Sequence, residues 1–397
     1  MVQFWKARRA VEEVVGPPLT FWQAFAVVAL GVLALNIIGV VPVLLGALQD
    51  EHRLSEAGIG ETAMLELLCM GITTGLCGAF LKAQRMRLIG ILGCLALAAL
   101  DIATLKVSDL GVLAVRAAAG APEGVLLWIT VGMVVRSRTP ERWSGVFFTG
   151  QTVAQLMLAG AFWVWIMPKF GSDGGFMTLG LTTLLGVPVA LLAPNRYKAL
   201  DQAGGVSGAP PLRGWIALFA TVVFIAANGA VSVYLEPLAR QAGLSPDVAR
   251  LALFASLVAQ VAGGTFATLI AGKARYVIVF GACVAVYLIS WALYGFTAQA
   301  WLFVLASVLA GATTLLAGPF LTPMIIEADP TRRAAMQSAG AQILGGASGP
   351  LLASFTVDDA NVRGVLVLGA IALVIGFAII LGLHATAPPD ARAVVEK

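Results

Sequence analysis

The sequence is poor in charged residues, and this shortage excludes most classes of soluble protein. Only 12% of its 397 residues are charged, whereas soluble domains carry roughly 25%. A soluble enzyme of this length would lack the polar surface that it needs, and a disordered chain or a coiled coil would be far richer in charge. Apolar residues instead make up 59% of the chain, so we expect that the solvent around this fold is lipid.

Histidine and cysteine are also scarce, which leaves little material for a metal centre or an enzyme active site. The four cysteines lie in apolar runs without CxxC spacing, so they predict neither a disulfide framework nor a metal cluster. The two histidines complete no HExxH motif and no serine–histidine–aspartate set, which weighs against a membrane-embedded enzyme. A phosphate-binding glycine loop is missing as well, so ATP-driven pumping is not expected. We therefore expect no cofactor, no metal and no enzymatic activity.

Long apolar runs fill most of the sequence. Six of them lie at about residues 20–48, 61–82, 87–106, 109–135, 143–167 and 174–194. Six more lie at about residues 213–236, 248–271, 276–296, 300–325, 334–356 and 361–384. Each run is long enough to cross a bilayer as a helix, because a crossing takes about 20 residues. The sequence therefore predicts an all-α integral membrane protein with twelve transmembrane helices.

The two sets of six runs repeat each other, which predicts two pseudo-symmetric bundles. Three pairs of like residues lie 191 positions apart: Gly120 and Gly311, Gln151 and Gln342, Arg142 and Arg333. We expect an N-terminal bundle at residues 1–194, a linker at 195–212 and a C-terminal bundle at 213–397. Because six is an even number, both bundles have the same orientation, as in parallel-repeat transporters.

Lysine and arginine predict how the chain is oriented in the membrane. Eighteen of them lie in the N-terminal segment, the even-numbered loops and the C-terminal tail, against six in the odd-numbered loops. By the positive-inside rule, both termini and the linker are cytoplasmic, and we expect a multi-pass protein of the cell (inner) membrane. The basic residues form no single patch, so nucleic acid is not an expected partner.

Two local motifs accompany this organisation. The fourth run reads Arg116-Ala-Ala-Ala-Gly120-Ala-Pro-Glu123-Gly124, and the loop after the second run reads Gly78-Ala-Phe-Leu-Lys82-Ala-Gln-Arg85-Met-Arg87. Together with the twelve runs and the repeat, they resemble the major facilitator superfamily of secondary transporters. The loop differs from the family's signature, because Lys82 stands in place of an aspartate and Arg85 in place of a second glycine.

The resemblance implies that two bundles expose a bound small molecule alternately to the two sides of the membrane. It implies a monomer surrounded by lipid, and it assigns Lys82, Arg85 and Arg87 to a cytoplasmic gate loop. It also implies a central cavity lined by polar side chains, for which six amides are candidates: Asn36, Gln151, Gln155, Asn228, Gln260 and Gln342. The alternative is that these amides tie helices together.

Four ionisable residues lie clearly inside the predicted spans: Glu66, Asp101, Arg116 and Glu123. A charge in hydrocarbon costs at least about 2.5–3.5 kcal/mol, so each must face a cavity or a partner. Arg116 and Glu123 share one helix face but are roughly 10 Å apart along it, which we interpret as too far for a direct ion pair. We expect Glu66 and Asp101 nearer the outer surface, either of them as a partner of Arg116, and a structural role for Asp101.

Glu123 is the candidate protonation site, because burial in a membrane favours the neutral form of a carboxyl. Arg116 would hold or release a carboxylate, with Glu66 as the third member of a proton-coupling set. The alternative is a structural arginine–carboxylate pair that fixes helix packing. The sequence thus predicts a proton-coupled secondary active transporter for a small organic solute. A facilitative uniporter, a drug or metabolite exporter, a membrane-embedded enzyme and a non-transporting sensor remain as alternatives.

Overall fold

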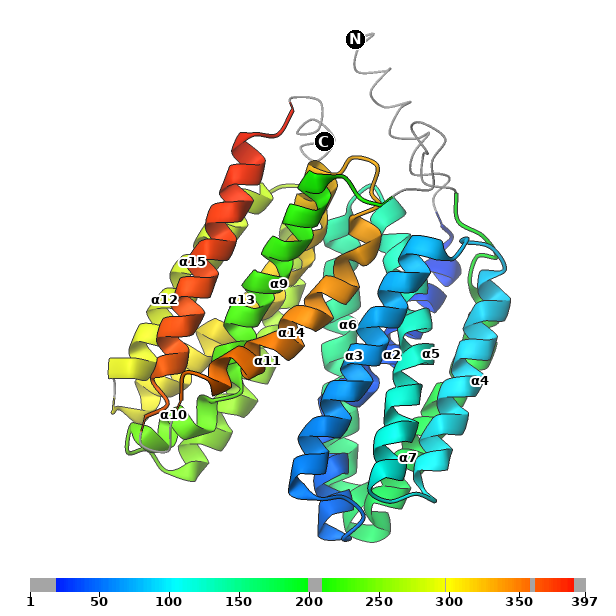
Figure 1. Cartoon of the computed structure of the whole chain (residues 1–397), viewed down its shortest axis with the longest axis horizontal. Coiled ribbons are helices and arrows are strands. Elements are labelled where there is room, and N and C mark those ends of the chain that lie inside the picture. The colour runs from blue at the N-terminus through cyan, green and yellow to red at the C-terminus, as the bar shows by residue number, and fades with distance from the viewer. Residues whose placement is uncertain (1–18, 199–208, 297, 358–360, 389–397) are drawn as a thin grey trace. The chain divides into compact units, whose positions relative to one another are not determined.

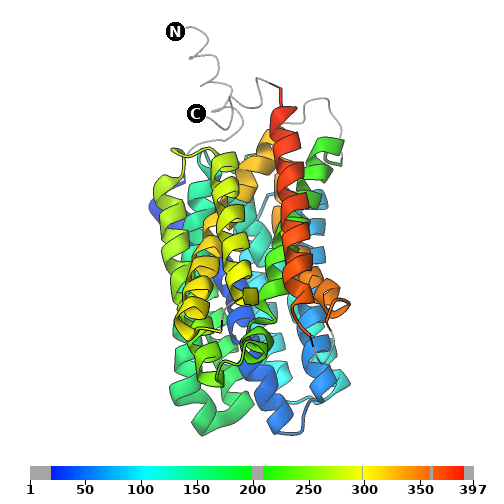
Figure 2. The same ribbon diagram turned by 90° about the vertical axis from the view of Figure 1, so that its left-hand side faces the viewer.

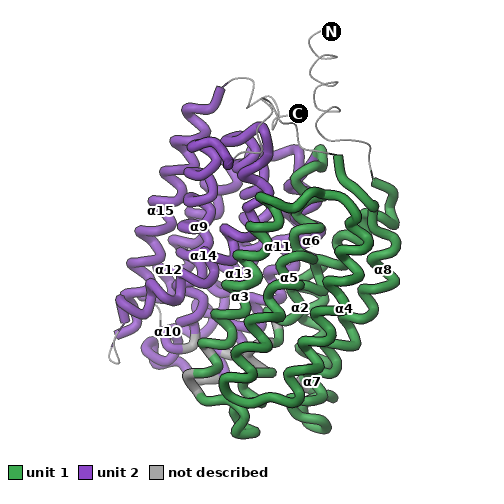
Figure 3. Tube along the Cα trace, turned by 45° about the vertical axis from the view of Figure 1, so that its right-hand side comes forward, with its two compact units in different colours: residues 1–138, 150–202 green, residues 139–149, 203–397 purple. Residues whose placement is uncertain are grey.

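The computed structural model describes residues 19–198, 209–296, 298–357 and 361–388, and these residues are almost entirely helical (Figure 1). Within these ranges the only strand-like pairing is an isolated bridge between Gln84 and Arg196. The predicted all-α class is therefore confirmed. The chain divides into two compact units, Met1–Arg138 with Gly150–Gln202 (unit 1) and Thr139–Thr149 with Ala203–Lys397 (unit 2) (Figure 3). The linker boundaries expected at 195–212 stay a prediction.

Unit 1 is built around helix α5. Its helices are α2 (Phe21–Asp50), α3 (Glu56–Phe80), α4 (Met86–Thr104), α5 (Leu110–Arg136), α7 (Met167–Leu184) and α8 (Gly186–Leu192), with the later part of α6 (Pro140–Ala161) and a π-helical turn, η1 (Phe162–Ile166). Helix α5 packs against α2, α3 and α4, and α7 packs against α4 and α2. Polar caps begin two of these helices, because Thr20 and Gln23 form a capping box for α2 and the Ser55 hydroxyl accepts from Gly58 at the start of α3.

Two glycines of α5 bring it unusually close to α3. A Cβ atom at Gly120 would collide with the backbone oxygen of Glu66, and one at Gly124 would collide with that of Met70. Small residues allow helix backbones to approach in membranes, where packing rather than the hydrophobic effect holds helices together. The close approach carries Glu66 of α3 toward the face of α5 that contains Arg116.

Unit 2 contains α9 (Leu212–Ser232), α10 (Leu235–Gln241), α11 (Pro246–Ile270), α12 (Tyr276–Phe296), α13 (Ala300–Ala328), the short 3-10 turn η2 (Ala335–Gln337), α14 (Ser338–Ser354) and α15 (Gly364–Ala385). Helix α11 packs against α13, and α9 packs against α14 and α15. Helices α12 and α15 also lie side by side (Figures 1 and 2). Glycines again permit close contacts, since a Cβ at Gly263 would collide with Ala312 and one at Gly349 with Ala226.

Ten segments of the described chain are long and apolar enough to cross a membrane, so this is a multi-pass membrane protein. One of them, Pro140–Leu192, has 53 residues, more than twice what one crossing needs. It leaves the helical conformation at Gly171, where φ is 58° and ψ is −155°, and it contains two of the predicted runs. The run expected at 334–356 corresponds to α14, which has only 17 residues.

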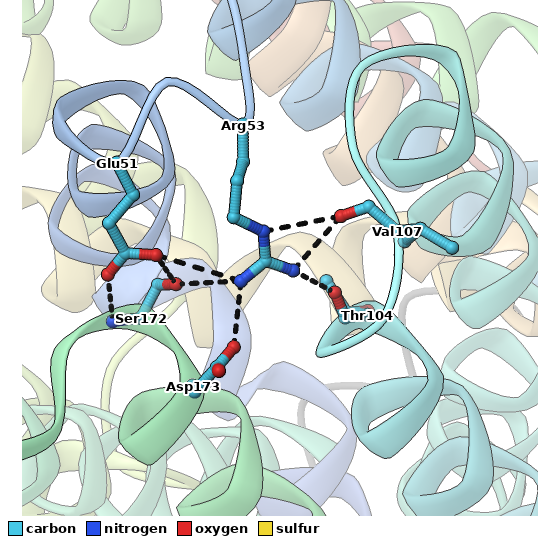
Figure 4. Close-up of polar contacts among 6 residues, drawn as sticks. All are labelled: Glu51, Arg53, Thr104, Val107, Ser172 and Asp173. Atoms are coloured by element: carbon cyan, nitrogen blue, oxygen red, sulfur yellow. Dashed lines mark hydrogen bonds and ion pairs between the residues drawn. The ribbon is translucent and has the colours of Figure 1, made fainter.

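Arg53, in the loop between α2 and α3, connects three parts of unit 1 at one end of its helices. Figure 4 shows its guanidinium among Glu51, Thr104, Val107, Ser172 and Asp173. It donates to the carbonyl oxygens of Thr104 at 2.6 Å and Val107 at 3.0 Å, and to the Asp173 carboxylate at 2.7 Å. The Glu51 carboxylate accepts from the backbone N–H of Ser172 at 2.8 Å, where the helix resumes after Gly171. A carboxylate is favourable at a helix N-terminus, so this cluster anchors α7 to the ends of α2 and α4.

Candidate functional site

A buried arginine surrounded by three carboxylates lies inside unit 1. Arg116 and Glu123 come from α5, Glu66 from α3 and Asp101 from α4. Arg116 is completely buried, and the three acids are only 1% to 3% exposed. Because charges are rarely this deeply buried without partners, the four residues form a single interacting group, which we call the Arg116 cluster.

The guanidinium of Arg116 reaches all three acids. Its Nε donates to Glu66 Oε2 at 3.2 Å and its Nη2 contacts Glu66 Oε1, so the two side chains meet in a bidentate pair. Its Nη1 donates to Asp101 Oδ1 at 2.7 Å, and Nη2 lies 3.5 Å from Glu123 Oε1. Bidentate pairing to a carboxylate is the strongest arrangement that arginine forms, so Glu66 is its principal partner.

The guanidinium also faces an aromatic ring. The ring centroid of Phe176, on α7, lies 5.5 Å from the central carbon of the Arg116 guanidinium, within the range of a cation–π interaction. Helix α7 approaches α4 closely at Gly180, where a Cβ would lie 3.3 Å from the Ala98 oxygen. Sequence reasoning missed Phe176, because nothing in an apolar run marks which aromatic ring faces a charge.

The cluster corrects one expectation and confirms another. Arg116 and Glu123 do form an ion pair, at 3.5 Å, because the roughly 10 Å between them separates the backbones and not the charged ends. Helical side chains lean toward the N-terminus, so Glu123 leans toward Arg116, whose long side chain spans the remaining gap. Glu66 and Asp101 are 2% and 3% exposed and both are partners of Arg116, as expected. Their depth in the membrane stays a prediction.

The charges of the cluster do not balance. With every group ionised, one guanidinium faces three carboxylates. Burying an uncompensated charge costs several kcal/mol, so the arrangement favours protonation of a carboxyl. Glu123 is the acid least engaged by Arg116, and its Oε2 atom is buried without a hydrogen-bond partner among the described residues. The arrangement is therefore chemically suited to hold a proton.

Comparison with known proteins identifies the fold. No protein-family model and no curated protein matches the amino-acid sequence. Among solved structures, a major facilitator superfamily transporter, FucP, in the outward conformation is similar with a TM-score of 0.72 at 14% identity, over 91% of this chain and 98% of that one. The chain has the major facilitator fold.

Two other similar structures agree with this assignment. The human organic anion transporter MFSD10 (TETRAN) gives a TM-score of 0.64 at 15% identity, over 94% of this chain and 99% of that one. The proton:xylose symporter XylE, bound to 6-bromo-6-deoxy-D-glucose, gives 0.69 at 13% identity, over 95% and 99%. The major facilitator fold that the sequence motifs predicted is thus confirmed over nearly the whole chain.

The amides predicted to line a cavity divide between the two units of this major facilitator fold. In unit 1, Gln155 Nε2 donates to the Leu35 carbonyl oxygen at 2.7 Å, which fits the alternative that an amide ties helices together. Asn36 Oδ1 and Gln151 Oε1 are buried without hydrogen-bond partners among the described residues. Asn228, Gln260 and Gln342 are partly buried in unit 2. Their contact with a solute stays a prediction.

The predicted gate loop is tied to the segment that follows α8. Lys82 and Arg85 are exposed, and Arg85 takes a left-handed conformation with φ of 56° just before α4. Arg87 Nε donates to the Ala193 carbonyl oxygen at 2.7 Å. Backbone hydrogen bonds of 3.0 Å run from Met86 to Asn195 and from Tyr197 to Ala83. A gating role for this loop stays a prediction.

Tyr197 strengthens this connection, and the sequence analysis did not single it out. Its hydroxyl donates to the Ile129 carbonyl oxygen at 3.0 Å, and the Arg136 guanidinium lies 5.5 Å from its ring centroid. Burial raises the pKa of Tyr197 above its ordinary value, so the hydroxyl remains a donor at physiological pH. The start of the predicted linker is therefore part of unit 1.

Unit 2 contains a buried acid that contacts a histidine. Glu327, at the end of α13, is 3% exposed, and its Oε1 lies 2.8 Å from His384 Nδ1 on α15. The Tyr276 hydroxyl, at the start of α12, donates to the same oxygen at 2.8 Å. Sequence reasoning missed this group because the apolar run ends before Glu327, which then resembles an ordinary loop residue. Among the described residues, no group of acids, histidines or cysteines is arranged to hold a metal ion.

Proposed function

We propose that this chain is a secondary active transporter that moves a small organic solute by alternating access and is driven by protons. The observation that carries the proposal is the Arg116 cluster, a buried arginine with more carboxylates than it can neutralise. Intramembrane charges of this kind mark proton relays and ion pathways. The major facilitator fold supports transport, because the similar structures include a fucose:proton symporter from E. coli and a proton:xylose symporter.

A proton fits the Arg116 cluster better than a metal cation does. The guanidinium already contacts all three carboxylates, so a sodium ion at their centre would have to displace a positive charge. A proton needs no such space, because it binds to a carboxyl oxygen. The Oε2 atom of Glu123, which has no hydrogen-bond partner among the described residues, offers a place for it. We therefore assign proton coupling to Glu123, with Arg116 and Glu66 as the pair that responds to its charge.

The contacts of Arg116 suggest how proton loss acts on the bundle. A deprotonated Glu123 competes for Nη2, which is shared with Glu66 and lies 3.5 Å from Glu123 Oε1. Movement of the guanidinium toward Glu123 weakens its bonds to α3 and α4. Because these helices pack on α5, a change of charge at Glu123 is converted into a change of helix packing in unit 1.

The remaining assignments complete the proposal. Residues 1–194 and 213–397 form the two bundles, the linker 195–212 and both termini are cytoplasmic, and the protein acts as a monomer in the cell (inner) membrane. The solute binds among the amides Asn36, Gln151, Asn228, Gln260 and Gln342. Gln155 also belongs to this set, although its Nε2 group already donates a hydrogen bond to the Leu35 carbonyl oxygen of α2.

The proposal is tested with purified protein in liposomes that contain a pH-sensitive dye. A thermal-shift screen over sugars, organic anions, amines and drugs first finds a solute, because a ligand stabilises the folded state that binds it. Fucose, xylose and organic anions are the first probes, as substrates of proteins with a similar fold. Addition of the solute should then move protons into or out of the liposomes.

Glu123→Gln provides the decisive variant, because glutamine imitates a carboxyl that never releases its proton. We expect it to abolish solute-driven proton movement while solute exchange persists, and the exposed Glu61→Gln on α3 serves as the control. Proton movement at the normal rate in Glu123→Gln rejects Glu123 as the coupling residue. Binding without flux identifies a sensor, and conversion of the solute identifies an enzyme.

A further inference from the structure

The number of protons that the Arg116 cluster holds follows from its charge count. One guanidinium neutralises one carboxylate, and Glu66 is the natural choice because it accepts two contacts from Arg116. Asp101 and Glu123 then remain as two negative charges in a site where no member is more than 3% exposed. A single proton on Glu123 still leaves the cluster with a net negative charge in a buried place.

Among the described residues of the helices that pack around the Arg116 cluster, no further cation compensates for that charge. The other charged residues of α2, α4 and α5 lie in the first or last turn of each helix, as do Glu56 of α3 and Lys169 of α7. Glu61 of α3 is exposed, and it would add negative charge. Asp173 of α7 is paired with Arg53 at 2.7 Å.

Of the two cations near the C-terminal end of α4, Lys106 is exposed. Arg53 is the other, and its charge is already matched. It bonds to the carbonyl oxygen of Thr104, three residues after Asp101, so the two sites are about one helical turn apart. Its ion pairs are with Asp173 at 2.7 Å and Glu51 at 3.6 Å. Asp101 is also in the last turn of α4, so it is the closest of the three acids to a helix end.

We propose that the Arg116 cluster binds two protons, one on Glu123 and one on Asp101, with Glu66 remaining ionised against Arg116. Asp101 is thus a second proton-binding residue and not only a structural partner. This deepens the proposed transport function by setting its coupling capacity at two protons in the N-terminal unit. The Nη1–Oδ1 hydrogen bond of 2.7 Å persists when Asp101 is protonated, because its carbonyl oxygen still accepts.

The pH dependence of thermal stability counts these protons without any solute. When the folded protein holds more protons than the unfolded chain, stability falls as pH rises, in proportion to the number of extra protons. We compare the wild type, Asp101→Asn, Glu123→Gln and the double variant in lipid nanodiscs between pH 5 and pH 8. The slope of stability against pH in the double variant serves as the baseline. After this baseline is subtracted, the slope of the wild type should be twice that of either single variant. Glu61→Gln should match the wild type, and a slope for Asp101→Asn equal to that of the wild type overturns the proposal.

Infrared spectroscopy gives an independent count on the wild type, so the proposal does not depend on the folding of a variant. Protonated buried carboxyls have a C=O stretch that is separate from that of carboxylates and shifts in D2O. We expect two such groups at low pH, one lost in Asp101→Asn and the other in Glu123→Gln. One group or none contradicts the proposal. Neither measurement requires transport, so two protons without solute-driven flux would reject the proposed function and leave this inference standing.

Discussion

At the residue scale, Arg116 holds the centre of unit 1 through its shape as much as its charge. Its planar guanidinium uses all three nitrogens to contact the carboxylates of Glu66, Asp101 and Glu123. It also faces the Phe176 ring. Lysine has a compact charge and no fork, so it cannot reproduce this set of contacts. The residue therefore sets both the electrostatics and the helix packing of the site.

Replacement of Arg116 by methionine should lower the free energy of unfolding by about 3–5 kcal/mol, because it leaves buried carboxylates without their cation. The free energy of unfolding of Arg116→Lys should lie between those of the wild type and Arg116→Met, because lysine keeps the charge but not the bidentate geometry. Thermal or denaturant unfolding in detergent measures both. If Arg116→Met is as stable as the wild type at pH 7, the cluster is not the electrostatic centre of unit 1.

At the element scale, the site depends on how closely α3 and α5 approach each other. The two glycines Gly120 and Gly124 remove the side chains that would keep these helices apart. A polar group placed on one helix can reach another only when the backbones are this close. The Arg53 cluster acts at the same scale, because it joins the ends of α2 and α4 to α7.

Gly120→Ala should separate α3 from α5, because its Cβ would collide with the Glu66 backbone oxygen. We expect a destabilisation of about 1–3 kcal/mol, the usual cost of overpacking, together with weaker proton coupling as Glu66 moves from Arg116. Gly160→Ala in α6 is the matched control, since a Cβ there meets nothing within 4 Å. It should be neutral or stabilising by up to about 1 kcal/mol, because alanine is the better helix former. Equal effects of the two substitutions would show that helix propensity, and not the close approach, determines the result.

At the scale of the whole molecule, the chain has the major facilitator fold, and its orientation in the membrane is a prediction of the charge distribution. Lys82, after α3, and Lys106, after α4, are both exposed and lie on opposite sides of the membrane in that prediction. The positive-inside rule places Lys82 in the cytoplasm.

Cysteine labelling tests this orientation in intact cells. In a background without the four native cysteines, Lys106→Cys should react with a membrane-impermeant thiol reagent added outside, and Lys82→Cys should react only after the membrane is opened. The two sites serve as controls for each other. The reverse pattern would invert the molecule and exchange the predicted cytoplasmic and outer loops.

The details of the site show how far sequence reasoning can go. The in-span charges Glu66, Asp101, Arg116 and Glu123 were recognised from their apolar surroundings alone, because a charge in such a run is costly. The ion pair between Arg116 and Glu123 was not predicted. The prediction took the spacing of the two residues along the helix as the distance between their charges. In the structure, the Arg116 side chain is long and Glu123 leans toward it, so Arg116 Nη2 and Glu123 Oε1 are 3.5 Å apart. Glu327 and Tyr197 were missed because they lie just outside the apolar runs, where nothing in the sequence marks burial.

The sequence by itself determined that this chain is a helical membrane protein. Lipid offers no hydrogen-bond partners, so the backbone N–H and C=O groups must bond to each other within helices. It also determined the repeat and the motifs that point to the major facilitator fold. Only the tertiary structure decided that α3, α4 and α5 bring three acids to one arginine. That outcome depends on how closely the glycine-bearing helices pack and on the direction in which long side chains point. Both are set by contacts between helices, so the sequence of a single span does not determine them.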